Sequence, residues 1–239
     1  MATQIELGGI PVDVLRKDIK HVHLSVHPPT GRVRISAPAR MDLATIRFFA
    51  ISKLGWIKRH QHTMREQKRE TPREFLERES HFVWGRRYLL TLREVERGRP
   101  GVELQHNRLV MKHRTGMKLT AKRTMLDGWY RQHMHEAVPI LIAKWQQLLG
   151  VKAERYFVQH MKTKWGSCNH LTRTIRLNTE LAKKPPVCLE YLIVHELVHL
   201  IEPTHGPRFI ELMDRLMPKC RHYRDELNRL PVRHEDWIY

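Results

Sequence analysis

The sequence predicts an α+β fold in which a β-rich module precedes a domain built around a buried helix. Alternating apolar and polar residues dominate the first half, and helical spacing of apolar residues follows over residues 118–149. Short strand patterns then lead into an apolar helix near residue 195. With 239 residues, the chain can bury a sizeable core as one large domain or two modest ones. We expect a β-rich module with one helix over residues 1–115 and a second domain over residues 116–239.

The first elements predicted are a hairpin and a helix. Apolar residues alternate over residues 22–26, and the alternation resumes at Val33 after a turn rich in proline and glycine at residues 28–31. Asp42 is a candidate N-cap, and apolar residues follow it with helical spacing over residues 43–57.

More strands are expected after a polar segment at residues 63–80, which we interpret as helix continuation or loop. Residues 82–92 have a strand pattern broken by a turn at residues 84–87. Residues 102–111 have another, with a bend at Asn107. These segments complete the β-rich module.

The second half begins with a long helix over residues 118–149, in which Pro139 predicts a kink or a junction. Its expected buried side consists of large apolar residues, namely Trp129, Tyr130, Ile140, Leu141, Trp145 and Leu148. Short strands are expected next, at residues 155–160, 164–168 and 174–178. Helices are then expected after the prolines at 185 and 186, over residues 209–216 and over residues 221–230.

The most informative motif is His195-Glu196-Leu197-Val198-His199, with His205 six residues further on. Positions i and i+4 share one helix face, so the rings of His195 and His199 can reach the same point. Pro203 and Gly206 predict a turn that brings His205 back toward them. Three histidines form a zinc site with one position open for water, and Glu196 lies where it can accept a proton from that water. The alternative is ordinary core or surface histidines, since the chain has 17 of them.

Charge and composition restrict the class of protein. The 43 Lys and Arg residues against 25 Asp and Glu give a net charge of +18, which favours an anionic partner such as nucleic acid or a nucleotide, or else a solvated basic surface. The 3 cysteines are too few and too irregularly spaced for a disulfide framework, so we expect a reducing, cytoplasmic compartment. No signal peptide or membrane-spanning segment is expected.

Several segments resemble the YgjP-like metallopeptidase family, and the resemblance covers nearly the whole chain. They are residues 32–38, 55–57, 84–88, 164–168, 175–178, 191–200 and 205–209. The resemblance implies a zincin-like domain in which a small β-sheet lies beside the active-site helix. It also implies that His195, His199 and His205 hold Zn2+ and that Glu196 is the general base.

Three functions remain open at this point. The first is a metallopeptidase that cleaves protein or peptide substrates through zinc-activated water, with Tyr223, His222 or Arg208 as a second donor to the oxyanion. An extended substrate could then pair with residues 164–167, where we expect Trp165 to be core. The second is a metal-dependent nucleotide phosphohydrolase, such as a nucleoside triphosphate pyrophosphatase, although the chain has no Walker-type loop. The third is a nucleic-acid-associated protease or binder.

Overall fold

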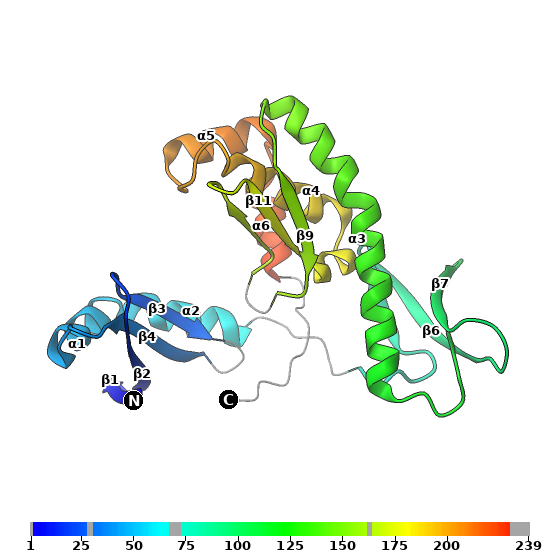
Figure 1. Cartoon of the computed structure of the whole chain (residues 1–239), viewed down its shortest axis with the longest axis horizontal. Coiled ribbons are helices and arrows are strands. Elements are labelled where there is room, and N and C mark those ends of the chain that lie inside the picture. Colours follow the sequence, from blue (N-terminus) through cyan, green and yellow to red (C-terminus); the bar gives the residue numbers. More distant parts are fainter. Residues whose placement is uncertain (1, 28–30, 67–72, 162–163, 230–239) are drawn as a thin grey trace. The chain divides into compact units, whose positions relative to one another are not determined.

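The described residues of the computed structural model are 2–27, 31–66, 73–161 and 164–229 (Figure 1). They form helices and small sheets, which confirms the predicted α+β class. Contacts within the chain define two units, Met1–Arg69 and Glu70–Arg233. Among the described residues, no helix combines the length and the apolar character needed to cross a membrane.

The first unit has one four-stranded sheet and two helices. Its strands are β1 (Ala2–Leu7), β2 (Ile10–Lys17), β3 (His23–His27) and β4 (Arg32–Pro38), and its helices are α1 (Leu43–Ser52) and α2 (Leu54–Glu66). The strand order is β1-β2-β4-β3, with β2 and β4 parallel and the other pairs antiparallel. The predicted hairpin is therefore present as β3 and β4, while residues 28–30 of its turn lie outside the described residues.

The single helix predicted for this module is wrong, because the chain forms two helices that meet at Lys53. The predicted N-cap is present, since Asp42 Oδ1 accepts a hydrogen bond of 2.7 Å from the Thr45 amide. Lys53 leaves the helical conformation, and Gly55, two residues later, has a low helix propensity. Apolar side chains of both helices nevertheless enter one core with the sheet, so the helical spacing continues across the break.

The second unit begins with another four-stranded sheet. Its strands are β5 (Ser80–Val83), β6 (Arg86–Glu94), β7 (Gly101–Gln105) and β8 (Arg108–His113), in the order β5-β6-β8-β7. The predicted turn between β5 and β6 and the bend at Asn107 are confirmed. Buried side chains such as Leu90 and Leu109 belong to the same core as the following helices. The boundary predicted at residues 115 and 116 thus falls inside this unit.

Helix α3 (Leu119–Leu149) runs without a break through Pro139 and ends at Gly150, which has a left-handed backbone with φ of 64°. Its buried stripe differs from the one predicted. The buried residues are Leu126, Tyr130, Met134, Val138, Ile142 and Trp145. Ile140 and Leu148 are 71% and 63% exposed, so their expected burial is wrong. Apolar residues occur on both sides of α3, and only packing decides which side is covered.

The rest of the second unit combines a small sheet with three helices. The strands are β9 (Arg155–Gln159), β10 (Gly166–Asn169) and β11 (Thr174–Asn178), and after the 3-10 helix η1 (Thr179–Lys183) come α4 (Pro186–Val198), α5 (Pro207–Leu216) and α6 (Cys220–Arg229). The strand order is β10-β11-β9, so β10 is an edge strand. The sheet lies beside α4, with β10 in contact with the helix (Figure 1).

The turn between β5 and β6 forms hydrogen bonds with the residues that precede α4. The amides of Trp84 and Gly85 donate hydrogen bonds of 2.8 and 3.2 Å to the carbonyls of Ala182 and Lys183. Gly85 has φ of +78°, and a Cβ built on it would lie 2.9 Å from Pro185 Cγ. Only glycine combines this conformation with so close an approach. The β5–β8 sheet therefore fixes the segment that leads into α4.

Candidate metal centre

Helix α4 carries the motif through the core of the second unit. Pro186 occupies its first turn, where a missing N–H is tolerated, and an apolar run follows in which Ile193, Val194 and Leu197 are fully buried. The helix ends at Val198, and the amides of Ile201 and Glu202 donate to the Val198 carbonyl. This tight exit turns the chain back toward the helix.

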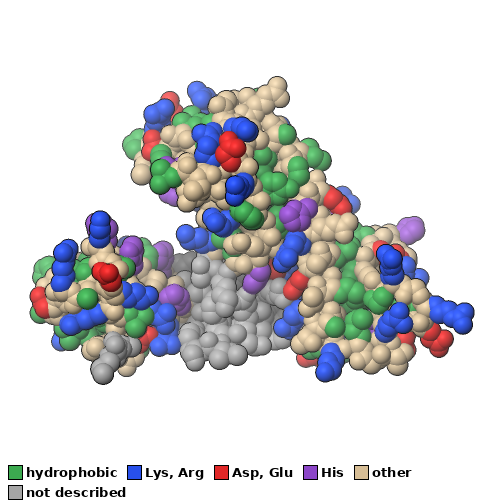
Figure 2. All heavy atoms as spheres, in the orientation of Figure 1, with side chains coloured by type: hydrophobic (Ala, Val, Ile, Leu, Met, Phe, Trp, Pro, Cys, Tyr) green, Lys and Arg blue, Asp and Glu red, His purple; other side chains and the backbone are tan. Residues whose placement is uncertain are grey.

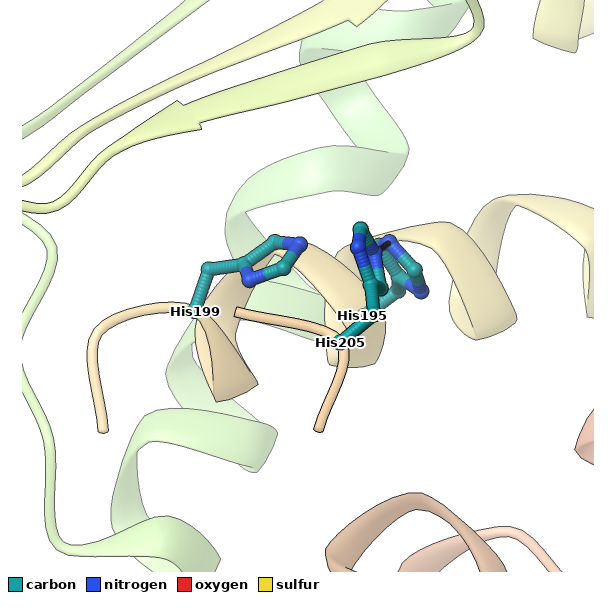
Figure 3. A group of neighbouring side chains, drawn as sticks. All are labelled: His195, His199 and His205. Carbon is teal, nitrogen blue, oxygen red and sulfur yellow. Dashed lines mark hydrogen bonds between the residues drawn. The ribbon is translucent and has the colours of Figure 1, made fainter. Parts of the chain in front are cut away.

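The turn brings together the three histidines expected from the sequence (Figure 3). His195 and His205 face each other with their Nε2 atoms 3.2 Å apart. The ring of His199 lies 4.9 Å from that of His195 and 4.6 Å from that of His205, between centroids. One ligand nitrogen from each ring lies within 4.8 Å of the other two.

This donor set fits a single metal ion. Zn–N bonds of about 2.0–2.1 Å in a tetrahedron place two nitrogens roughly 3.3 Å apart, close to the spacing of His195 and His205. His199 Nδ1 lies 3.1 Å from the Glu202 carbonyl, and donation to this oxygen leaves Nε2 free to bind a metal. Phe209 covers the group, with its ring 4.7–5.0 Å from all three imidazoles.

Burial favours the neutral form that metal binding requires. It lowers the pKa of His195 to about 3, and the neighbouring rings of His199 and His205 contribute to the same shift. Burial also lowers the pKa of His199. A neutral imidazole has a free lone pair, so His195 and His199 can bind a cation at neutral pH.

Glu196 lies between the histidines in sequence and faces the edge strand β10. Its side chain is buried, and a Cβ built on Gly166 would lie 2.7 Å from its Oε1 atom. In the absence of a metal, burial raises the pKa of Glu196 to about 8, while the positive charge of Lys164 opposes the shift. The structure thus places a carboxylate beside both the histidine motif and the strand.

The segment before β10 is held by Asn178, a residue that our sequence reasoning did not single out. Its Nδ2 atom donates hydrogen bonds of 2.8 and 2.9 Å to the carbonyls of Met161 and Lys164. Its own amide donates to the Trp165 carbonyl at 2.8 Å. Trp165 packs against the core, as expected. Asn178 therefore positions the entry to the edge strand.

The expected second donors differ in their surroundings, and two of them, His222 and Tyr223, have their ring centroids 5.8 Å apart. Tyr223 packs against the core, while His222 and Arg208 are exposed. Arg224, which the sequence reasoning also missed, lines one cavity with His195 and His205. The signal for Arg224 was weak, because helical spacing alone does not show which neighbour α6 packs against.

Comparison with known proteins identifies a matching protein family. The model of the "YgjP-like, metallopeptidase domain" matches residues 20–230. Among solved structures, the metallopeptidase zymogen jannalysin of Methanocaldococcus jannaschii is similar, with 22% identity and a TM-score of 0.35 over 38% of this chain and 92% of that chain. The zymogen abylysin of Pyrococcus abyssi has 21% identity and a TM-score of 0.36 over 40% and 99%. No curated protein matches. The range matched by the family includes the three histidines and Glu196.

Proposed function

The chain belongs to the YgjP-like metallopeptidase family and is a metal-dependent hydrolase, and from this premise we propose that it is a zinc peptidase whose general base is Glu196. The observation that carries the proposal is the convergence of His195, His199 and His205 beside a buried carboxylate. Family membership implies a divalent metal. Zinc is our proposal, because an all-imidazole set with three protein ligands is typical of catalytic zinc.

The three histidines would hold the ion. The backbone carbonyl of Glu202 orients His199, and Phe209 keeps the rings packed together. When bound, zinc lowers the pKa of a coordinated water toward neutrality and polarises the substrate carbonyl. The remaining steps belong to residues of the chain.

Glu196 is suited to move the proton. A general base works best when its pKa lies near the operating pH, and burial moves the pKa of this carboxyl upward. In the proposed mechanism its carboxylate accepts a proton from the attacking water and passes it to the leaving nitrogen. Gly166 allows β10 to approach without displacing the carboxylate, because any larger side chain would contact Oε1.

The peptide would lie along β10. This strand pairs with β11 through one edge and ends the order of its sheet, so its other edge is a candidate for an added strand. Residues 164–167 would then contact the substrate backbone, and Asn178 holds their approach to the site. We place the enzyme in the cytoplasm, since its free thiols at Cys168, Cys188 and Cys220 fit a reducing compartment.

The proposal is tested with metal analysis and turnover together. We expect zinc to be lost from His199→Ala, and to be kept in Glu196→Gln while cleavage of a denatured protein stops. His135→Ala is the control, because His135 is an exposed histidine on α3. Nucleoside triphosphates are assayed in parallel. Release of phosphate or pyrophosphate without peptide fragments would contradict the peptidase and favour the phosphohydrolase.

A further inference from the structure

A cavity of about 570 Å³ opens beside the histidines, between α4, α5 and α6. His195 and His205 form part of its wall, so a group inside it lies next to the candidate metal centre. The other lining residues come from one face of each helix, as the spacing of Cys220 and Arg224 on α6 illustrates. The size is sufficient for a side chain.

The floor of this cavity is apolar. It is made by Tyr191, Phe209, Met213 and Cys220, each of which is at most 6% exposed. Such a surface favours the aliphatic or aromatic part of an occupant, because burying it removes apolar area from water. It provides little that would bind a fully polar group.

The rim of the cavity is charged. Arg221 Nη2 donates to Asp214 Oδ2 at 3.1 Å, and Cys220 Sγ donates to the same carboxylate at 3.3 Å, so the charge of Asp214 is compensated. Arg224 Nε contacts Asp225 Oδ1 at 3.3 Å, but both side chains of this pair are more than half exposed. Exposed ion pairs are weak because water screens both charges, so a ligand carboxylate can displace Asp225.

Arg224 lines the cavity together with His195 and His205, so its guanidinium lies on the same cavity wall as the candidate metal ligands. A cation beside a divalent metal ion is unfavourable unless an anion lies between them or near both. On the face drawn in Figure 2, Lys and Arg side chains are spread over the second unit and form no single patch. A preference for a negatively charged substrate residue at this site must therefore come from the cavity itself.

We propose that this cavity is the subsite for the residue next to the scissile bond, and that Arg224 selects a carboxylate on a short apolar stem. The inference rests on the proposed peptidase function. The carboxylate has two sources, the side chain of a glutamate within the substrate or the C-terminal carboxylate of the peptide. A bidentate contact with guanidinium serves both.

The test uses the zinc-loaded full chain and peptides built on a cleavage site first mapped in a denatured protein by mass spectrometry. The residues flanking the scissile bond are varied among Glu, Gln and Lys, and each peptide is made with a free or an amidated C-terminus. We expect kcat/KM for Glu to exceed that for Gln by about tenfold. Arg224→Gln should remove this preference and Arg224→Glu should shift it toward Lys. Arg215→Gln is the control, since Arg215 is exposed on α5.

Binding separates this inference from the peptidase function. Fluorescence anisotropy of the same peptides on Glu196→Gln needs no turnover. Tighter binding of Glu peptides or free C-termini that depends on Arg224 supports the cavity assignment, even if no peptide is cleaved and the peptidase proposal fails. Equal cleavage and equal binding of Glu and Gln peptides, with no effect of the free C-terminus, would overturn the cavity assignment and leave the peptidase intact. Arg224-dependent binding of nucleoside triphosphates without any binding of acidic peptides would overturn both. The Glu and Gln comparison in the wild type does not depend on how any Arg224 variant folds.

Discussion

Replacing Gly166 with alanine tests whether the edge strand positions Glu196, the proposed general base. The added Cβ would lie 2.7 Å from Glu196 Oε1 and 3.1 Å from both the Arg176 carbonyl oxygen and Leu192 Cδ2. The Arg176 carbonyl belongs to β11, the strand paired with β10, so it has little freedom to move. The side chain of Glu196 is the flexible partner, and its carboxylate must retreat.

The size of this movement follows from the distances. Ordinary van der Waals contact begins at 3.4 Å, so Oε1 must shift by about 0.7 Å from its 2.7 Å separation. Misplacing a catalytic group by about 1 Å can reduce the rate by a factor of about 100. We therefore expect kcat to fall by roughly 10- to 100-fold. Overpacking should also lower the free energy of unfolding by about 1–3 kcal/mol.

Zinc content, kcat and urea unfolding of the same preparation distinguish this effect from loss of the metal. The three heavy atoms nearest to the new Cβ belong to Glu196, Arg176 and Leu192 and to none of the histidine rings, so zinc should remain at one ion per chain. Gly128→Ala on α3 is the matched control, because a Cβ there meets nothing within 4 Å. It should leave kcat unchanged and stabilise the helix by up to about 1 kcal/mol. Wild-type kcat in Gly166→Ala would refute the proposed contact between β10 and Glu196.

Three further predictions concern stability and pH. Gly85→Ala should lower the free energy of unfolding in urea by about 2–4 kcal/mol, from its left-handed backbone and the contact with Pro185, whereas the uncrowded Gly98→Ala should show the strain alone. Asn178→Ala should cost about 2 kcal/mol in the same assay and raise KM, because it loses two hydrogen bonds to the segment before β10; unchanged KM would argue against a positioning role. In the metal-free protein, burial raises the pKa of Glu196 from 4.5 to about 8. Between these two pH values the folded state binds one more proton than the unfolded state. The free energy of unfolding therefore falls as pH rises from 4.5 to about 8. Thermal unfolding should therefore show Glu196→Gln gaining stability over the wild type from pH 5 to pH 9, and a constant difference would count against the shift.

Local patterns predicted those parts of the fold that depend on neighbours in sequence. The i, i+4 spacing of His195 and His199 places both rings on one side of α4 whatever else the chain does, and the proline and glycine after them predicted the return of His205. The alternation around β3 and β4 and the N-cap at Asp42 are equally local and are present in the structure. The catalytic and ligand roles of these residues stay predictions.

Predictions that required knowledge of packing were less successful. Helical spacing continues from α1 into α2, so the break at Lys53 left no trace in the apolar pattern. Helix α3 has apolar side chains on all of its sides, so the sequence pattern could not reveal that Ile140 and Leu148 face solvent. In each case the local propensity is compatible with several arrangements, and contacts with distant segments select one of them.

The residues around the candidate centre fall into the same two groups. The residues proposed to bind the metal follow a local sequence pattern, whereas the residue proposed to select the substrate is placed by packing. The three candidate metal ligands lie within eleven consecutive residues, so their recognition needs only the geometry of one helix and one turn. Gly166 and Arg224, in contrast, reach α4 from elements that lie about twenty residues before and after it in the sequence. A substitution at Arg224 should thus change which substrate is bound while leaving the histidines undisturbed. The cavity and the candidate metal centre share His195 and His205, but no residue of α6 is a proposed metal ligand. Substitutions on α6 should therefore change substrate selectivity without changing the metal content.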